Sequence, residues 1–166
     1  VLTSVDRDDL TDGGSSHIAK CVDASKIKSP NIVIEVLSPD FRGNLDHLDI
    51  LLESGLDVFS QNIETVERLT HPVRDPRAGY KQTLKMLRHA CEKGFLSKSG
   101  MMLGLGEQRD EVIKTMRDLH DSGVKILTIG QYLRPTINHL PVKKYIHPDE
   151  FLEYSDIGME IGIEEV

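Results

Sequence analysis

The stretch Lys98-Ser-Gly-Met-Met-Leu-Gly-Leu-Gly-Glu107 decides the fold class of this chain. Its first half, Lys98–Leu103, is short, apolar at its centre and free of proline, which predicts a buried strand. Its second half, Gly104–Glu107, is a glycine turn in which the backbone can approach a ligand. A strand, a glycine turn and a helix together place backbone N–H groups beside a bound molecule. A simple tight turn explains the same glycines equally well, and the third glycine of the dinucleotide fingerprint is absent.

Strand and helix patterns alternate along the whole chain. Strands are predicted at residues 1–5, 31–37, 56–59, 98–103 and 125–131. Helices are predicted from Ser15 or Ser16, over 45–52 and 80–93, up to Gly123 with its inner face at 112–119, and from Pro148 to Met159. The prolines at 72 and 76 predict a loop, and Tyr132–Val142 is predicted to be irregular. This α/β alternation predicts a parallel sheet buried on both faces. A closed or partial (β/α) barrel and an open doubly wound sheet both fit, and both bind ligands at the carboxyl ends of their strands.

Composition excludes several function classes. The net charge of −7 argues against a partner nucleic acid, and no run approaches the 18 apolar residues of a membrane span. At 166 residues the chain is long enough for one domain with its own core. Neither end carries a turn or cap signal, so we expect residues 1–166 to be one domain of a larger protein, truncated at both ends.

The cysteines and histidines predict no metal site. Cys21 and Cys91 lack a CxxC partner and fall on apolar helix faces, which favours small buried hydrophobic residues. A disulfide or a cluster ligand is the minority interpretation. The seven histidines include no HxxxH pair.

Polar side chains follow every predicted strand. An asparagine and a glutamate two residues apart can bind the vicinal hydroxyls of a ribose, and arginines can bind carboxylates. Solvated loops and helix caps explain the same residue types. The residues themselves therefore predict only an enzyme-like α/β domain with a polar ligand site, and the side chains concerned are Ser4, Asp6, Arg7, Asp40, Arg42, Gln61, Asn62, Glu64, Glu107, Gln131, Tyr132 and Arg134.

Seven motifs spread over the whole chain resemble the lipoyl synthase family, in order and at the family's spacing. They are Val1–Gly14, Pro39-Asp-Phe-Arg-Gly43, Asn62-Ile-Glu-Thr-Val66, Val73–Ala78, Lys98–Glu107, Leu127–Tyr132 and His139-Leu-Pro-Val142. The resemblance implies a partial (β/α)6 TIM-like barrel of the radical S-adenosylmethionine (SAM) type, with about five βα units in this chain.

The family's activity is the insertion of two sulfur atoms into an octanoyl chain on a lysine of an acceptor protein. The resemblance implies S-adenosyl-L-methionine and two [4Fe–4S] clusters as cofactors, one cluster generating a 5′-deoxyadenosyl radical and the other donating sulfur. It implies an octanoylated lipoyl domain or H-protein-type acceptor as partner, and an electron donor of the ferredoxin or flavodoxin type.

The resemblance also assigns roles to the strand ends. Thr3, Ser4 and Asp6 would lie near the methionyl end of SAM, Asn62 and Glu64 near its ribose, and Lys98 near its carboxylate. The residues that would border the adenine are Gly104, Glu107, Gln131, Tyr132 and Leu133. The residues that would face the acceptor are Arg7, Arg42 and Arg134.

The chain departs from the family pattern in its cysteines. The C-x3-C-x2-C motif, the auxiliary-cluster cysteines and the R-S-S-Y segment are absent, so the chain alone is expected to be inactive. Gln61 stands where many members have histidine. The alternatives are a cluster-free module that binds SAM or a nucleoside, and a barrel enzyme that binds phosphate at the Gly104 turn. The Val73–Ala78 segment favours the mitochondrial matrix over a bacterial cytoplasm.

Overall fold

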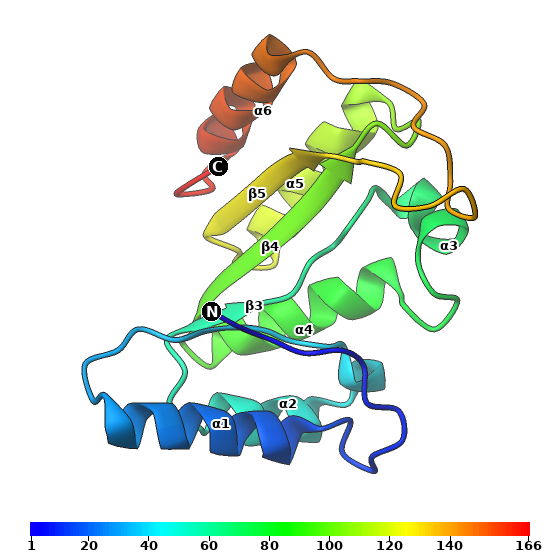
Figure 1. The fold of residues 1–166 in the computed structure, drawn as a ribbon. Coiled ribbons are helices and arrows are strands. Elements are labelled where there is room, and N and C mark those ends of the chain that lie inside the picture. The colour runs from blue at the N-terminus through cyan, green and yellow to red at the C-terminus, as the bar shows by residue number, and fades with distance from the viewer.

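A five-stranded parallel sheet forms the centre of the computed structural model, which describes residues 1–166 (Figure 1). The strands lie in the order of the sequence: β1 (Leu2–Thr3), β2 (Glu35–Leu37), β3 (Val58–Ser60), β4 (Leu96–Leu103) and β5 (Ile126–Gln131). A doubly wound sheet reverses its strand order at a switch point, whereas a barrel wall keeps consecutive order. The structure is therefore a partial (β/α) barrel, as one of the two predicted alternatives requires.

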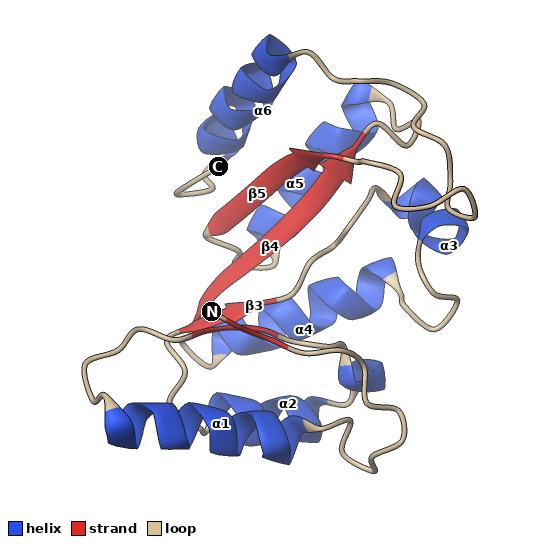
Figure 2. Cartoon of the chain, viewed as in Figure 1, coloured by secondary structure: helices blue, strands red, loops and turns tan.

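The helices run along the outside of this curved sheet (Figure 2). Glycines with positive φ, such as Gly55, Gly94 and Gly123, follow three of them before the next strand. No helix is long and apolar enough to cross a membrane. The helices are α1 (Ser15–Lys28), α2 (Leu45–Leu52), the short α3 (Thr70–Val73), α4 (Tyr80–Glu92), α5 (Arg109–Asp121) and α6 (Pro148–Ile161), with 3-10 turns at Phe41–Gly43 and Glu67–Leu69.

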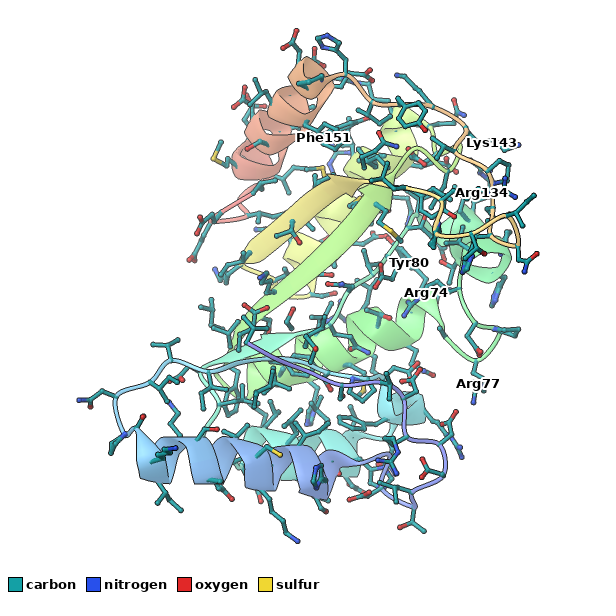
Figure 3. All side chains as sticks on the ribbon, viewed as in Figure 1. Arg74, Arg77, Tyr80, Arg134, Lys143 and Phe151 are labelled. Atoms are coloured by element: carbon teal, nitrogen blue, oxygen red, sulfur yellow. The ribbon has the colours of Figure 1, made fainter.

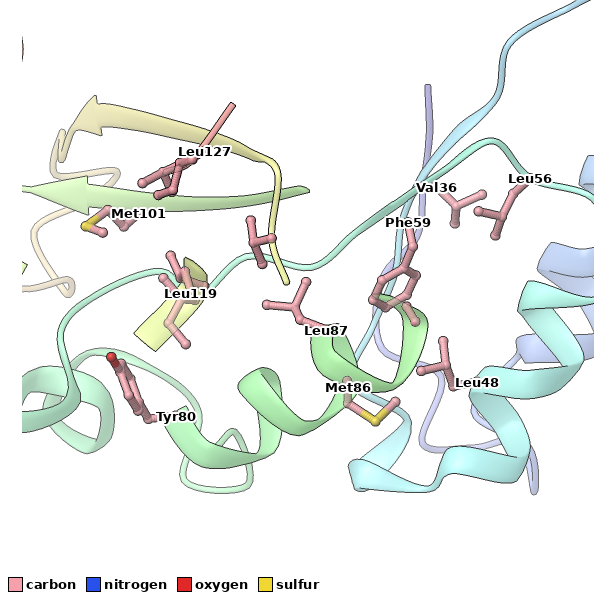
Figure 4. Close-up of a cluster of buried hydrophobic side chains, with 14 of the residues drawn as sticks. Val36, Leu48, Leu56, Phe59, Tyr80, Met86, Leu87, Met101, Leu119 and Leu127 are labelled. Carbon is pink, nitrogen blue, oxygen red and sulfur yellow. The ribbon is translucent and has the colours of Figure 1, made fainter. Parts of the chain in front are cut away.

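One apolar core joins the sheet to its helices (Figure 4). Alternate strand residues point to the helix side, among them Val36 and Phe59, which are 1% and 0% exposed. The other face of the sheet carries Glu35, Lys98 and the exposed Thr128. The prediction that the strands are buried on both faces holds for β3, whose three residues are all buried, and fails for β5, where Thr128 is exposed, because helices cover only the outer face of a barrel wall.

Several local predictions need correction. The predicted strands at 1–5 and 31–37 shrink to β1 and β2, since Ile32 and Val33 are exposed and lie outside the strand pairing. The predicted loop around Pro72 contains α3, because proline is tolerated in the first turn of a helix. The predicted helices and the irregular 132–142 segment are confirmed.

Both cysteines were predicted to be small buried hydrophobic residues, and neither is fully buried. Cys21 is exposed, because α1 buries Ile18, Ala19 and Val22 instead. Cys91 is half-buried, and burial raises the pKa of its thiol.

Candidate functional site

A cavity of about 400 Å³ lies at the carboxyl ends of β1, β2 and β3. It gathers four predicted site residues from separate strands: Ser4 and Asp6 follow β1, and Asn62 and Glu64 follow β3. The full lining is Ser4, Val5, Asp6, Leu37, Ser38, Pro39, Asp40, Gln61, Asn62, Glu64, Arg74 and Ala78.

The backbone after β3 holds Asn62 and Glu64 against β4. The N–H of Glu64 donates to the Gly100 carbonyl at 3.0 Å, and Met102 N–H donates to the Glu64 carbonyl at 2.8 Å. Glu64 has a φ of 66°, a left-handed conformation that is uncommon for residues other than glycine and concentrates at functional sites. A Cβ on Gly100 would lie 2.8 Å from the Asn62 Oδ1, so only glycine lets Asn62 lie across β4.

The cavity is acidic and polar. Asp6, Asp40 and Glu64 contribute carboxylates, and Arg74 is the one basic residue in the lining. Asp40 is occupied by Gln82 Nε2, which donates at 2.7 Å, and Arg74 donates to Thr83. Asp6 and Glu64 take part in none of the ion pairs of the chain, so their charge can attract a cationic ligand that carries hydroxyl groups.

The glycine turn after β4 is closed by its own chain. The Glu107 carboxylate accepts from the N–H groups of Gly104 and Leu105 at 2.6 and 3.0 Å. These two N–H groups are therefore bonded within the turn, and the expectation that Gly104 and Glu107 border the adenine stays a prediction. A phosphate at this turn would compete with that carboxylate, so the turn does not support the phosphate-binding alternative.

Gln131 is equally occupied. Its Nε2 donates to the carbonyls of Leu103, Tyr132 and Lys144 at 3.2, 2.9 and 3.2 Å, and its Oε1 accepts from Ile146 N–H at 2.8 Å. The Tyr132 hydroxyl donates to the Leu140 carbonyl, and Leu133 is exposed. These contacts attach the 132–146 loop to the ends of β4 and β5.

Two other predicted cofactor contacts lie outside the cavity lining. Lys98 is in the first half of β4, and its Nζ is 3.0 and 3.1 Å from the Glu35 carboxylate oxygens. Thr3, the last residue of β1, is exposed beside the cavity-lining Ser4.

The predicted arginines lie on the exposed rim, engaged with neighbouring groups. Arg7 pairs with Asp9, which raises the pKa of Arg7, and Arg134 donates to the His139 and Ile137 carbonyls. Arg42, with a φ of 54°, shares Asp8 with Arg77. Figure 3 places Arg74, Arg77 and Arg134 at the end to which the strands point.

Arg74 and Ser38 line the cavity although neither was predicted as a site residue. Ser38 directly follows β2, so the rule on strand ends already pointed to it. Arg74 belongs to the loop before α4, and only the Val73–Ala78 motif could have identified it.

Comparison with known proteins agrees with the fold. The model of the radical SAM superfamily matches residues 1–119. The chain belongs to the radical SAM superfamily. The solved radical S-adenosylmethionine methyltransferase TsrM from Kitasatospora setae, which holds cobalamin and a [4Fe–4S] cluster, has a similar fold, with a TM-score of 0.53 and 14% identity over 72% of this chain and 25% of TsrM.

Similar curated proteins of this superfamily carry the name lipoyl synthase. The chain is 56% identical to those of Marinobacter nauticus and Ectopseudomonas mendocina and 54% identical to that of Thermus thermophilus, over 100% of its own length. It covers 48%, 48% and 52% of these relatives, so the radical SAM chain spans about half their length.

Proposed function

We propose that this radical SAM chain is the adenosyl-binding part of a lipoyl synthase, which inserts two sulfur atoms into protein-bound octanoyl-lysine. The observation that carries the proposal is the joint presence of Ser4, Asp6, Asn62 and Glu64 in one cavity at the strand ends. Relatives 52–56% identical over the whole chain are named lipoyl synthase, which supports this reaction over other radical SAM reactions.

The cavity fits S-adenosyl-L-methionine in charge and hydrogen-bonding groups. Asp6 and Glu64 provide negative charge for a sulfonium and an ammonium group, and Arg74 offers a partner for a carboxylate. Asn62 lies close enough to the backbone of Gly100 that no side chain fits between them. When bound, this cofactor supplies hydrogen-abstraction chemistry, and the residues named here hold and orient its polar groups.

The side chains of this chain do not fit a [4Fe–4S] cluster. No group of three or more His, Cys, Asp or Glu residues in the chain could hold a metal ion, and Cys21 and Cys91 lie on α1 and α4. We therefore propose that the two clusters of the full enzyme use ligands from other segments of the protein, and that the 166-residue chain alone does not turn over.

The acceptor is proposed to be an octanoylated lipoyl domain or H-protein-type protein, with a ferredoxin or flavodoxin type of electron donor. The curated relatives named above come from bacteria and give no support to a mitochondrial matrix location. We therefore propose a bacterial cytoplasm.

The test uses the full-length protein that contains this chain, loaded with clusters and supplied with a reductant. We expect formation of 5′-deoxyadenosine from SAM, with sulfur transfer to an octanoylated acceptor. A cluster-loaded protein that forms no 5′-deoxyadenosine contradicts the proposal. A protein that forms it without modifying the acceptor retains radical SAM chemistry but is not a lipoyl synthase.

A further inference from the structure

Gln61 has a buried side chain with no hydrogen-bond partner. The residue is 2% exposed, and neither Nε2 nor Oε1 is bonded to any group of the protein. It lines the cavity at the strand ends, next to Asn62. Its backbone is fixed, because its N–H donates to the Lys98 carbonyl at 3.1 Å.

A buried amide without partners is costly. Native proteins satisfy nearly all buried polar groups, and exceptions are frequently sites that a water or a ligand completes. The other glutamine at the strand ends shows the contrast: the two N–H groups of Gln131 are shared among three backbone carbonyls, and its Oε1 accepts from Ile146 N–H. Of the residues with unpartnered buried side-chain atoms, Gln61, Thr65 and Ser97, only Gln61 lines the cavity, so its amide is the candidate for a contact with a ligand's polar atoms.

The chemistry of an amide restricts those atoms. Oε1 accepts and Nε2 donates, about 2 Å apart, so the complementary group has an adjacent donor and acceptor. Adenosine has this pattern at two edges of its adenine, N6–H/N7 and N6–H/N1, and at the ribose 2′,3′-hydroxyls. At the β4–β5 ends, where the adenine was expected, the turn amides and the Gln131 side chain are already bonded.

We propose that Gln61 is a ligand-binding residue whose amide hydrogen-bonds an adjacent donor–acceptor pair of the adenosyl group. This inference rests on the proposed function. It predicts opposite effects on stability and on affinity, which a purely structural residue does not produce. Removing the amide removes an unsatisfied polar group from the free protein, so stability is unchanged or raised, and it removes a contact to the ligand, so affinity falls.

The variant is Gln61→Met, which keeps the length of the side chain and removes both polar atoms. The control is Thr65→Val, because Thr65 is 1% exposed, its hydroxyl is likewise unpartnered, and it does not line the cavity. Gln61→His is the rescue variant, since a neutral imidazole retains one donor and one acceptor.

The experiment measures binding of S-adenosylhomocysteine by calorimetry, and thermal unfolding of the ligand-free chain. Gln61→Met should weaken binding about 10- to 100-fold with an unchanged or raised Tm, while Thr65→Val should bind like the parent chain. Gln61→His should recover part of the loss. Adenosine, 2′-deoxyadenosine and 7-deazaadenosine then assign the contact, because Gln61→Met abolishes the discrimination against the analogue that lacks the contacted atom.

Equal affinity of Gln61→Met and the parent chain overturns the inference and leaves the adenosyl site intact. Equal weakening by Thr65→Val, or a lower Tm for Gln61→Met, assigns Gln61 a structural role and also overturns it. If the parent chain binds no S-adenosylhomocysteine while it remains folded, the proposed adenosyl site itself fails, and the inference fails with it.

Discussion

The carboxyl ends of β1–β3 and the carboxyl ends of β4–β5 carry similar residue types but use them differently. At β1–β3, polar side chains line a cavity, and the Gln61 amide has no partner. At β4–β5, the side chains of Glu107 and Gln131 hydrogen-bond backbone groups of the adjoining turn and loop. Polarity at a strand end therefore does not identify a ligand site by itself, whereas an unpartnered buried side chain that also lines a cavity, as Gln61 does, is a stronger indication.

The two regions also differ in their proposed roles: one stabilises the fold and the other binds the ligand. The β4–β5 end is a scaffold in which Glu107 closes the turn and Gln131 fixes the 132–146 loop. At the β1–β3 end, Asp6, Asn62 and Glu64 line one cavity, which we propose as the ligand site. Substitutions at the β4–β5 end should therefore affect mainly stability, and substitutions at the β1–β3 end should affect mainly ligand binding.

The largest effect is expected for Gly104→Ala. Gly104 has a φ of +107°, and an added Cβ would lie 2.4 Å from Gln131 Nε2 and 2.5 Å from the Lys144 carbonyl. The strained backbone and the clash should together lower the free energy of unfolding by roughly 3 kcal/mol. Gly106→Ala is the matched control, because its φ is +106° and its Cβ would meet only Lys143 Cγ, at 3.6 Å.

We expect Gly106→Ala to cost about 1 kcal/mol, so the difference between the two variants measures the packing around Gln131. Urea unfolding followed by circular dichroism gives both values. Equal losses for the two glycines would show that the Gln131 contacts do not restrict this turn.

A smaller effect is expected for Gln131→Met, which compares the two glutamines directly. The substitution removes the Nε2 hydrogen bonds to the loop carbonyls and leaves Ile146 N–H without its acceptor, a loss of about 2 kcal/mol. Gln61→Met should cost nothing in the free protein. Unfolding free energies of the Gln131→Met and Gln61→Met variants, together with amide exchange at Ile146, measure this difference. Equal destabilisation by the two substitutions would contradict the distinction between a structural end and a binding end of the sheet.

The sequence could predict the parallel α/β fold because its strand and helix patterns alternate and glycines end the helices. It also placed polar residues at the strand ends, since in parallel sheets these ends meet at one edge. The strand and helix patterns alone could not separate a barrel wall from a doubly wound sheet, because strand order depends on tertiary pairing; the partial barrel was predicted only through the family motifs. The contrast between Gln61 and Gln131 was equally out of reach, since partners such as the Lys144 carbonyl lie 13 residues away in sequence.

The smallest effect is expected at Asp12, in the loop that connects the cavity residue Asp6 to α1. Hydrogen bonds from Ser16 and from the Gly14 N–H lower the pKa of the Asp12 carboxyl far below its usual value. Its stabilisation is therefore complete above the unfolded-state pKa of about 3.9 and declines as the pH falls toward the lowered folded-state pKa. Asp12→Ala should cost about 1 kcal/mol at pH 7, as the loss of a helix cap does, and progressively less below pH 4.

Thermal unfolding between pH 7 and pH 3 checks the Asp12 prediction, with Asp23→Ala as control because Asp23 is exposed in the middle of α1. Asp12→Ala also tests the difference between the two strand-end regions. If the loop before α1 positions Asp6, Asp12→Ala should also weaken S-adenosylhomocysteine binding, which the β4–β5 variants should affect less. A pH-independent loss would mean that the Asp12 side chain acts through its packing and not through its charge.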